Sequence, residues 1–273
     1  MTEEIRKKIE DAQMVLVGIG KEMEEKFHGM PEDPEYAELL RQAGEMEQRE
    51  TVEQYIRLSW LRTHPDRRKK QAYEALAGLL SGKNYFVVTL CTDDAVFGTG
   101  LEEGRIVAPC GGFRALQCPF CAQEDAAEEK KEAGEGPEGL FRDSACWEGT
   151  LSRIAAGEAL SGMEFPRCPK CGKLLSFNQI GTSGYLEAGY LPQWEKYRKW
   201  LQGTLNRRLC ILELGAGMEY PSVIRFPFER VAFFNQKAEL IRVHSRLYQM
   251  TAELSGRGIS VAEDPADFLI GER

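Results

Sequence analysis

The chain has 273 residues, of which 42% are hydrophobic and 29% are charged, so it holds enough apolar material for one large or two modest domains. Its formal net charge of −8 argues against a nucleic-acid partner, because an acidic chain repels phosphate backbones. No apolar run reaches the roughly 18 residues of a membrane span, and the charged start MTEEIRKKIEDAQ is unlike a signal peptide.

We therefore expect a cytoplasmic protein that contacts no membrane. Thiols stay reduced in that compartment. The eight cysteines are then metal ligands, core residues or reactive thiols rather than disulfides.

Helix signals and apolar runs alternate along the chain. A helix is expected to begin after Thr2, and the region 21–82 has a helical pattern with helix starts near Pro34 and Pro65. A further amphipathic helix is expected at 191–205. Short apolar runs predict four buried strands: MVLVGIG (14–20), NYFVVTL (84–90), LCILEL (209–214) and ELIRVH (239–244).

Buried strands that alternate with helices predict an α/β protein with a Rossmann-like, doubly wound parallel sheet. In such sheets ligands bind at the carboxyl ends of the strands. The loops expected to form the site are Gly18–Gly20, Cys91–Phe97, Gly215–Pro221 and His244–Ser245.

Two Cys-x-x-Cys pairs, CPFC and CPKC, lie in the middle of the chain. Each tight turn lets two thiolates face one ion, so the two pairs predict a closed, four-sulfur zinc site that serves structure rather than catalysis. The acidic, glycine-rich run EDAAEEKKEAGEGPEG between them is expected to be a solvated excursion. The expected zinc ligands are Cys118, Cys121, Cys168 and Cys171.

A zinc module set between the strands of a dinucleotide-type sheet resembles the sirtuin (Sir2-like) family. GIG (18–20) stands where sirtuins carry Gly-Ala-Gly, and TLCTDD (89–94) stands where they carry Thr-Gln-Asn-x-Asp. CGGFRALQC (110–118) has the spacing of the His-Gly stretch before the first zinc pair. LELGAGMEYPSVIRFPFE (212–229) is most similar to the macrodomain-linked class M branch of that family.

The resemblance implies NAD or ADP-ribose as a ligand beside zinc. It implies, for an active protein, NAD-dependent transfer of ADP-ribose to a protein rather than deacylation, with a lipoyl-carrier or another protein as acceptor. It also implies an NAD-type domain of residues 1–110 and 185–273, with a helical part at about 21–83, and an inserted zinc module of residues 111–184. The nucleotide contacts that it implies are Gly18, Gly20, Asp93, Gly215, Gly217, His244 and Ser245.

Cysteines stand at two positions that carry catalytic residues in the family. The Asn that orients the nicotinamide ribose falls at Cys91, and the His or Gln that works on the ribose hydroxyls falls at Cys110. The candidate catalytic residues are therefore Cys110, Cys91 and Asp93. Cysteine acts as a base only as a thiolate, which needs a nearby cation such as Arg105 or Arg114.

The first glycine loop also departs from the family, because several charged residues follow it. Carboxylates near a pyrophosphate repel it unless they point away. The residues concerned are Lys21, Glu22, Glu24 and Glu25.

Three interpretations stay open at this point. The cysteines are inert in a cleft that binds NAD or ADP-ribose without turnover, or one of them is a working base or an ADP-ribose-accepting nucleophile in a divergent transferase. In the third, the cleft has lost the nucleotide, and the protein is a catalytically dead sirtuin-fold scaffold or a partner-binding module. Asp93 also has a simple alternative, since it can cap the turn that follows it.

Overall fold

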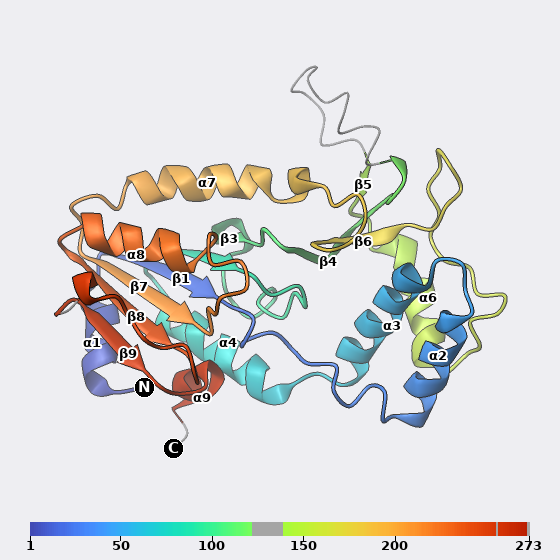
Figure 1. Cartoon of the computed structure of the whole chain (residues 1–273), viewed down its shortest axis with the longest axis horizontal. Helices are drawn as coiled ribbons and strands as arrows, with labels where there is room; N and C mark the ends of the chain where they lie inside the picture. The colour runs from blue at the N-terminus through green and yellow to red at the C-terminus, as the bar shows by residue number, and fades with distance from the viewer. Residues whose placement is uncertain (122–138, 255, 272–273) are drawn as a thin grey trace.

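The computed structural model describes residues 1–121, 139–254 and 256–271 of the chain (Figure 1). The acidic run expected as a solvated excursion, residues 124–139, lies outside the described residues except for its last glycine.

A six-stranded sheet with parallel pairing throughout forms the larger part of the molecule. All four strands expected from the sequence are present, and one short edge strand extends the sheet on each side. The order is β3-β2-β1-β7-β8-β9. The strands are β1 (Met14–Ile19), β2 (Asn84–Thr89), β3 (Ile106–Val107), β7 (Leu209–Leu214), β8 (Ala238–Val243) and β9 (Gly258–Val261).

Helices cover both faces of this sheet, as a doubly wound fold requires (Figure 1). One face packs against α1 (Glu3–Asp11), α4 (Arg67–Leu79) and α9 (Pro265–Ile270). The opposite face packs against α7 (Leu191–Gln202) and α8 (Arg225–Phe234). Three of the five helices have a side-chain cap at the first turn, supplied by Thr2, Asp66 and Asp264.

A second, smaller body is built on a three-stranded antiparallel sheet in the order β5-β4-β6. Its core includes Phe177, whose ring contacts that of Trp147 edge to face and that of Tyr55 at a tilt. The elements of this body are α2 (Pro34–Gly44), α3 (Arg49–Thr63), β4 (Gly111–Gln117), β5 (Leu140–Phe141), α6 (Ala145–Ala155) and β6 (Ser176–Gln179).

The helical region expected at 21–82 contains three separate helices, α2, α3 and α4, and the segment 20–33 is irregular. Helices α2 and α3 share their core with the antiparallel sheet, whereas α4 packs on the large sheet. The division of the chain at 110 and 185 stays a prediction.

Three short 3-10 helices complete the described secondary structure: η1 (Glu103–Arg105), η2 (Glu187–Gly189) and η3 (Ala252–Leu254). Among the described helices, none has the length and apolarity needed to cross a membrane.

Candidate functional site

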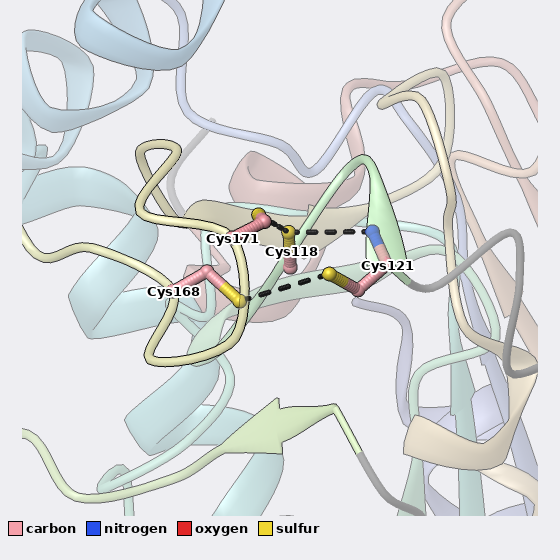
Figure 2. Close-up of side chains that lie close together, drawn as sticks. All are labelled: Cys118, Cys121, Cys168 and Cys171. Atoms are coloured by element: carbon pink, nitrogen blue, oxygen red, sulfur yellow. Dashed lines mark hydrogen bonds between the residues drawn. The ribbon is translucent and has the colours of Figure 1, made fainter.

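The four cysteines of the two Cys-x-x-Cys pairs converge on one point of the smaller body (Figure 2). Their sulfur atoms all lie within 4.8 Å of one another. The first pair follows the end of β4, and the second lies in a hairpin closed by the bridge between Arg167 and Leu174. Gly172 follows the second pair with a φ of 71°, the left-handed conformation that turns the backbone back toward the sulfurs.

The sulfur geometry fits a tetrahedral metal site. The Sγ atoms of Cys118 and Cys171 are 3.5 Å apart, and those of Cys121 and Cys168 are 3.9 Å apart. Four sulfurs held at about 2.3 Å from one zinc ion lie about 3.8 Å from each other, so both distances agree with such a shell. The four cysteines can therefore bind a metal.

The strand order of the large sheet defines a second place of interest. The chain winds outward in one direction from β1 and in the other from β7, so the topological switch point lies between these two strands. Ligands of open α/β sheets bind in the crevice at this point, at the carboxyl ends of the strands.

Glycines at the switch point are required by a close backbone approach. A Cβ on Gly20 would lie 2.1 Å from the carbonyl oxygen of Gly215. Gly215 itself has a φ of 68°, and a Cβ there would lie 2.6 Å from the Cβ of Glu22. Gly217 is less confined, since a Cβ there would make an ordinary contact with the ring of His244 at 3.4 Å.

Gly18, expected in the nucleotide loop, has a different position. It lies inside β1, where a Cβ would come within 2.6 Å of Ile224 and 2.7 Å of Phe228. The small residue therefore lets α8 pack closely on the sheet, and Gly18 faces a helix rather than the crevice.

Asp93 connects two loops at the end of β2. Its carboxylate accepts the backbone N–H of Glu25 at 2.6 Å and that of Ala95 at 3.1 Å. The second bond is the turn cap named among the sequence alternatives. Burial raises the pKa of Asp93, although the two backbone donors oppose that rise.

Cys91 and Cys110 lie at the carboxyl edge but in core clusters on opposite faces of the large sheet. Cys91 is buried and donates to the carbonyl oxygen of Gly20 at 3.3 Å. Cys110 is only 1% exposed. Burial raises the pKa of the Cys110 thiol to about 11 and raises that of Cys91 well above its ordinary value.

The cation that faces these thiols is Lys21, whose charge lowers both pKa values less than burial raises them. The two arginines suggested by the sequence are engaged elsewhere. Arg105 contacts Glu102 at 3.0 Å, and Arg114 pairs with Glu103 at 2.6 Å. Neither cysteine therefore has the environment of a thiolate at neutral pH.

His244 and Ser245 follow β8 and meet the charged segment that follows β1. Glu22 accepts the backbone N–H of Ser245 at 3.1 Å and also accepts its hydroxyl. The Nδ1 atom of His244 accepts backbone N–H groups of Arg246 and Leu247 and lies 3.0 Å from Glu22. Burial lowers the pKa of His244, and the charge of Glu22 opposes that fall.

Glu24 and Lys69 hold the same charged segment from the other side. Glu24 accepts the N–H of Thr92 at 2.7 Å and its hydroxyl at 2.8 Å, and pairs with Lys21 at 2.6 Å. The buried Lys69 donates to the carbonyl oxygens of Glu22 and Glu24. The sequence showed that carboxylates crowd this entry, but it gave no signal that they turn inward onto two strand ends.

A buried ionic cluster supports the loop after β8, and sequence reasoning missed it. Arg242 pairs with Glu213 at 2.5 Å and with Glu229 at 2.8 Å, and both partners in the first pair are at most 1% exposed. Arg225 donates to the carbonyl oxygens of Leu247 and Gln249. The sequence did contain a signal for this cluster, because Glu213 and Arg242 are charged residues within two predicted buried strands.

A cavity of about 220 Å³ lies apart from the switch point, between the two bodies. Its wall includes Asp94, whose pKa is raised to about 7 by burial, and Arg114. The residues expected to contact the nucleotide are not in its lining, so this cavity is not assigned to the nucleotide.

Two known proteins are similar to this chain in sequence. No protein-family model matches the chain. A "Protein ADP-ribosyltransferase" of Staphylococcus aureus is 24% identical over 96% of this chain and 84% of its own length. A "Probable bifunctional ADP-ribose hydrolase/ADP-ribosyltransferase" of Fusarium oxysporum f. sp. cubense is 26% identical over 59% of this chain and 26% of its own length.

Solved structures of Sir2 proteins share the architecture. A Sir2 homologue in complex with NAD superimposes with a TM-score of 0.54 over 99% of this chain and 92% of its own, at 14% sequence identity. The expected α/β architecture is thereby confirmed.

Proposed function

We propose that this chain, which has the Sir2 fold, binds NAD or ADP-ribose at the switch point and transfers ADP-ribose from NAD to a protein. The observation that carries the proposal is the close contact of Gly20 with Gly215 at the switch point of a Sir2 sheet. Similarity to a protein ADP-ribosyltransferase over 96% of the chain favours transfer over deacylation. The macrodomain-linked branch and a lipoyl-carrier acceptor belong to the same proposal.

Zinc is the metal that the four cysteines would hold, since thiolate ligands in a tetrahedral set favour it. When bound, the ion would tie the end of β4 to the hairpin of the second cysteine pair. Its role is structural because all four positions are taken by protein sulfur.

The chain's own residues would bind the nucleotide mainly through backbone groups at the strand ends. Gly217 leaves room for a phosphate to approach the backbone, and Ser245 offers an N–H and a hydroxyl. The close contact of Gly20 with Gly215 holds the two strand ends together beside them. Asp93 would position the loop after β2 by holding the N–H of Glu25. His244 borders the site beside Gly217.

A raised thiol pKa limits what the cysteines contribute to chemistry. With a pKa of about 11, Cys110 is protonated at neutral pH and does not remove a proton from a ribose hydroxyl. This observation favours a second candidate function, a protein that binds NAD or ADP-ribose without turnover.

Titration calorimetry with NAD and with ADP-ribose tests the proposal. Gly217→Leu places a side chain against His244 without backbone strain and should weaken binding at least about tenfold. Gly78→Leu, at an exposed position of α4 with no atom within 4 Å of a new Cβ, is the matched control and should bind like the wild type. Equal binding by both variants, or no binding by the wild type, would contradict the nucleotide site.

Release of nicotinamide separates the two candidate functions. NAD incubated with the protein and a lipoyl-carrier protein should yield nicotinamide and an acceptor heavier by one ADP-ribose. Binding of NAD with no nicotinamide released over hours would support the binding protein instead.

A further inference from the structure

The segment Gly20–Glu25 crosses the carboxyl edge of the sheet at the switch point. Glu22 follows the end of β1 in the chain, and its backbone N–H donates to the carbonyl oxygen of Gly215 after the end of β7. Its side chain then reaches past β7 to Ser245 at the end of β8. One side chain therefore spans the place where the fold binds an anionic ligand.

The donors that Glu22 uses are those that a phosphate would use. Its two carboxylate oxygens accept the backbone N–H and the hydroxyl of Ser245. Carboxylate and phosphate oxygens are both anionic acceptors, and both gain charge-assisted hydrogen bonds from such groups. A nucleotide phosphate at the end of β8 therefore competes directly with this side chain.

Glu22 is an anion held by neutral donors, which distinguishes it from Glu24. Glu24 is paired with the ammonium of Lys21 at 2.6 Å. For Glu22 the described residues offer only His244 at ion-pair distance, and burial lowers the pKa of that ring. Exchange of the Glu22 carboxylate for another anion therefore breaks no ion pair with a described lysine or arginine.

The backbone beneath Glu22 is fixed independently of its carboxylate. Lys69, 5% exposed, donates to the carbonyl oxygens of Glu22 and Glu24 from α4. The N–H of Glu25 is held by Asp93. The side chain can thus swing away from Ser245 while the loop keeps its path.

We propose that the Glu22 carboxylate is an internal competitor that occupies the phosphate-binding donors of Ser245 and must be displaced when the nucleotide enters. It follows that Glu22 sets the affinity of the cleft for anionic ligands. This inference rests on the proposed nucleotide function, and the test below separates the two.

The test compares Glu22→Gln with Glu263→Gln. Glutamine keeps the size and one acceptor oxygen of Glu22 but removes the charge. Glu263 follows β9 at the same edge of the sheet, so its variant removes one negative charge without touching Ser245. ADP-ribose should bind Glu22→Gln about tenfold more tightly than the wild type, and it should bind Glu263→Gln within about twofold.

Amide hydrogen exchange in the absence of ligand gives a second readout. Peptides covering residues 244–247 should exchange at least about threefold faster in Glu22→Gln, because the N–H of Ser245 loses a charged acceptor. Glu263→Gln should leave that exchange unchanged.

The outcomes distinguish the competitor role of Glu22 from the nucleotide function. Weaker binding of ADP-ribose by Glu22→Gln would show that Glu22 holds the ligand and would overturn its role as a competitor. Unchanged exchange at 244–247 would overturn the contact itself. If neither the wild type nor Glu22→Gln binds ADP-ribose at millimolar concentration, the nucleotide function and the competition fail together. Faster amide exchange at 244–247 in Glu22→Gln would then show only that Glu22 contacts Ser245 in the folded protein.

Discussion

Alkylation of Cys110 by iodoacetamide tests whether the residue at this family position works as a nucleophile or base. The thiol is 1% exposed, and burial raises its pKa to about 11 despite the charge of Lys21. Only the thiolate reacts. At pH 7.5 a thiol of that pKa is about 0.03% ionised, whereas an ordinary thiol of pKa about 8.5 is about 10% ionised. Ionisation alone therefore slows the reaction about 300-fold, and burial slows it further.

The assay is time-resolved mass spectrometry of tryptic peptides, with Cys146 as the internal reference because it is exposed in the same protein. We expect Cys110 to react at least about 100-fold more slowly than Cys146 at pH 7.5. Its rate should rise about tenfold per pH unit between pH 7 and 9, since the thiolate fraction grows in that proportion below the pKa.

A rate for Cys110 within about tenfold of that for Cys146 would refute the reasoning. Protection of that fast reaction by NAD would further show a thiolate in the nucleotide site, and Cys110 would then be a working residue of a divergent transferase. Under the inert interpretation, Cys110→Ala keeps the calorimetric affinity for NAD and ADP-ribose of the wild type.

Three further outcomes are expected. Cys118→Ser should lose the bound metal in elemental analysis while Cys146→Ser keeps it; equal metal content would refute the four-cysteine site. Asp94→Asn should be more stable than the wild type at pH 8 by up to roughly 4 kcal/mol in urea unfolding and nearly equal to it near pH 4. Burial raises the pKa of Asp94 to about 7, so the wild type loses stability as pH rises from about 4 to 7, and a parallel pH profile of the variant would contradict this. Arg242→Met should cost about 3–5 kcal/mol because it leaves a buried carboxylate unpaired, and adding Glu213→Leu should recover at least about half; no recovery would argue against the ion pair.

Local patterns in the sequence were sufficient for the main strands, the helix starts and the two cysteine pairs. The four apolar runs became β1, β2, β7 and β8 with ends shifted by at most one residue, because a buried parallel strand must be apolar on both faces. The helix starts expected near Pro34 and Pro65 correspond to α2, which begins at Pro34, and to α4, which begins at Arg67. A Cys-x-x-Cys turn brings its two sulfurs together by itself, so each pair needed no knowledge of the fold, whereas the meeting of the two pairs depends on the tertiary structure.

The short strands β4, β5 and β6 were outside the reach of the sequence, since two- to seven-residue strands acquire their identity from antiparallel partners elsewhere in the chain. The assignment of α2 and α3 to the core of the smaller body depends in the same way on long-range packing.

Only the tertiary structure decided the chemistry of the switch point. Gly18 faces α8 because the twist and packing of the sheet bring Phe228 over β1, which no local signal records. Burial raises the pKa of Cys110, and the cation that opposes this rise is Lys21, which is far from Cys110 in the sequence. The direction of the Glu22 side chain was set by the parallel neighbours β7 and β8, which bring Ser245 within hydrogen-bond distance from more than two hundred residues away. Spacing fixes which residues share a turn, but burial and side-chain direction depend on which distant strands become neighbours.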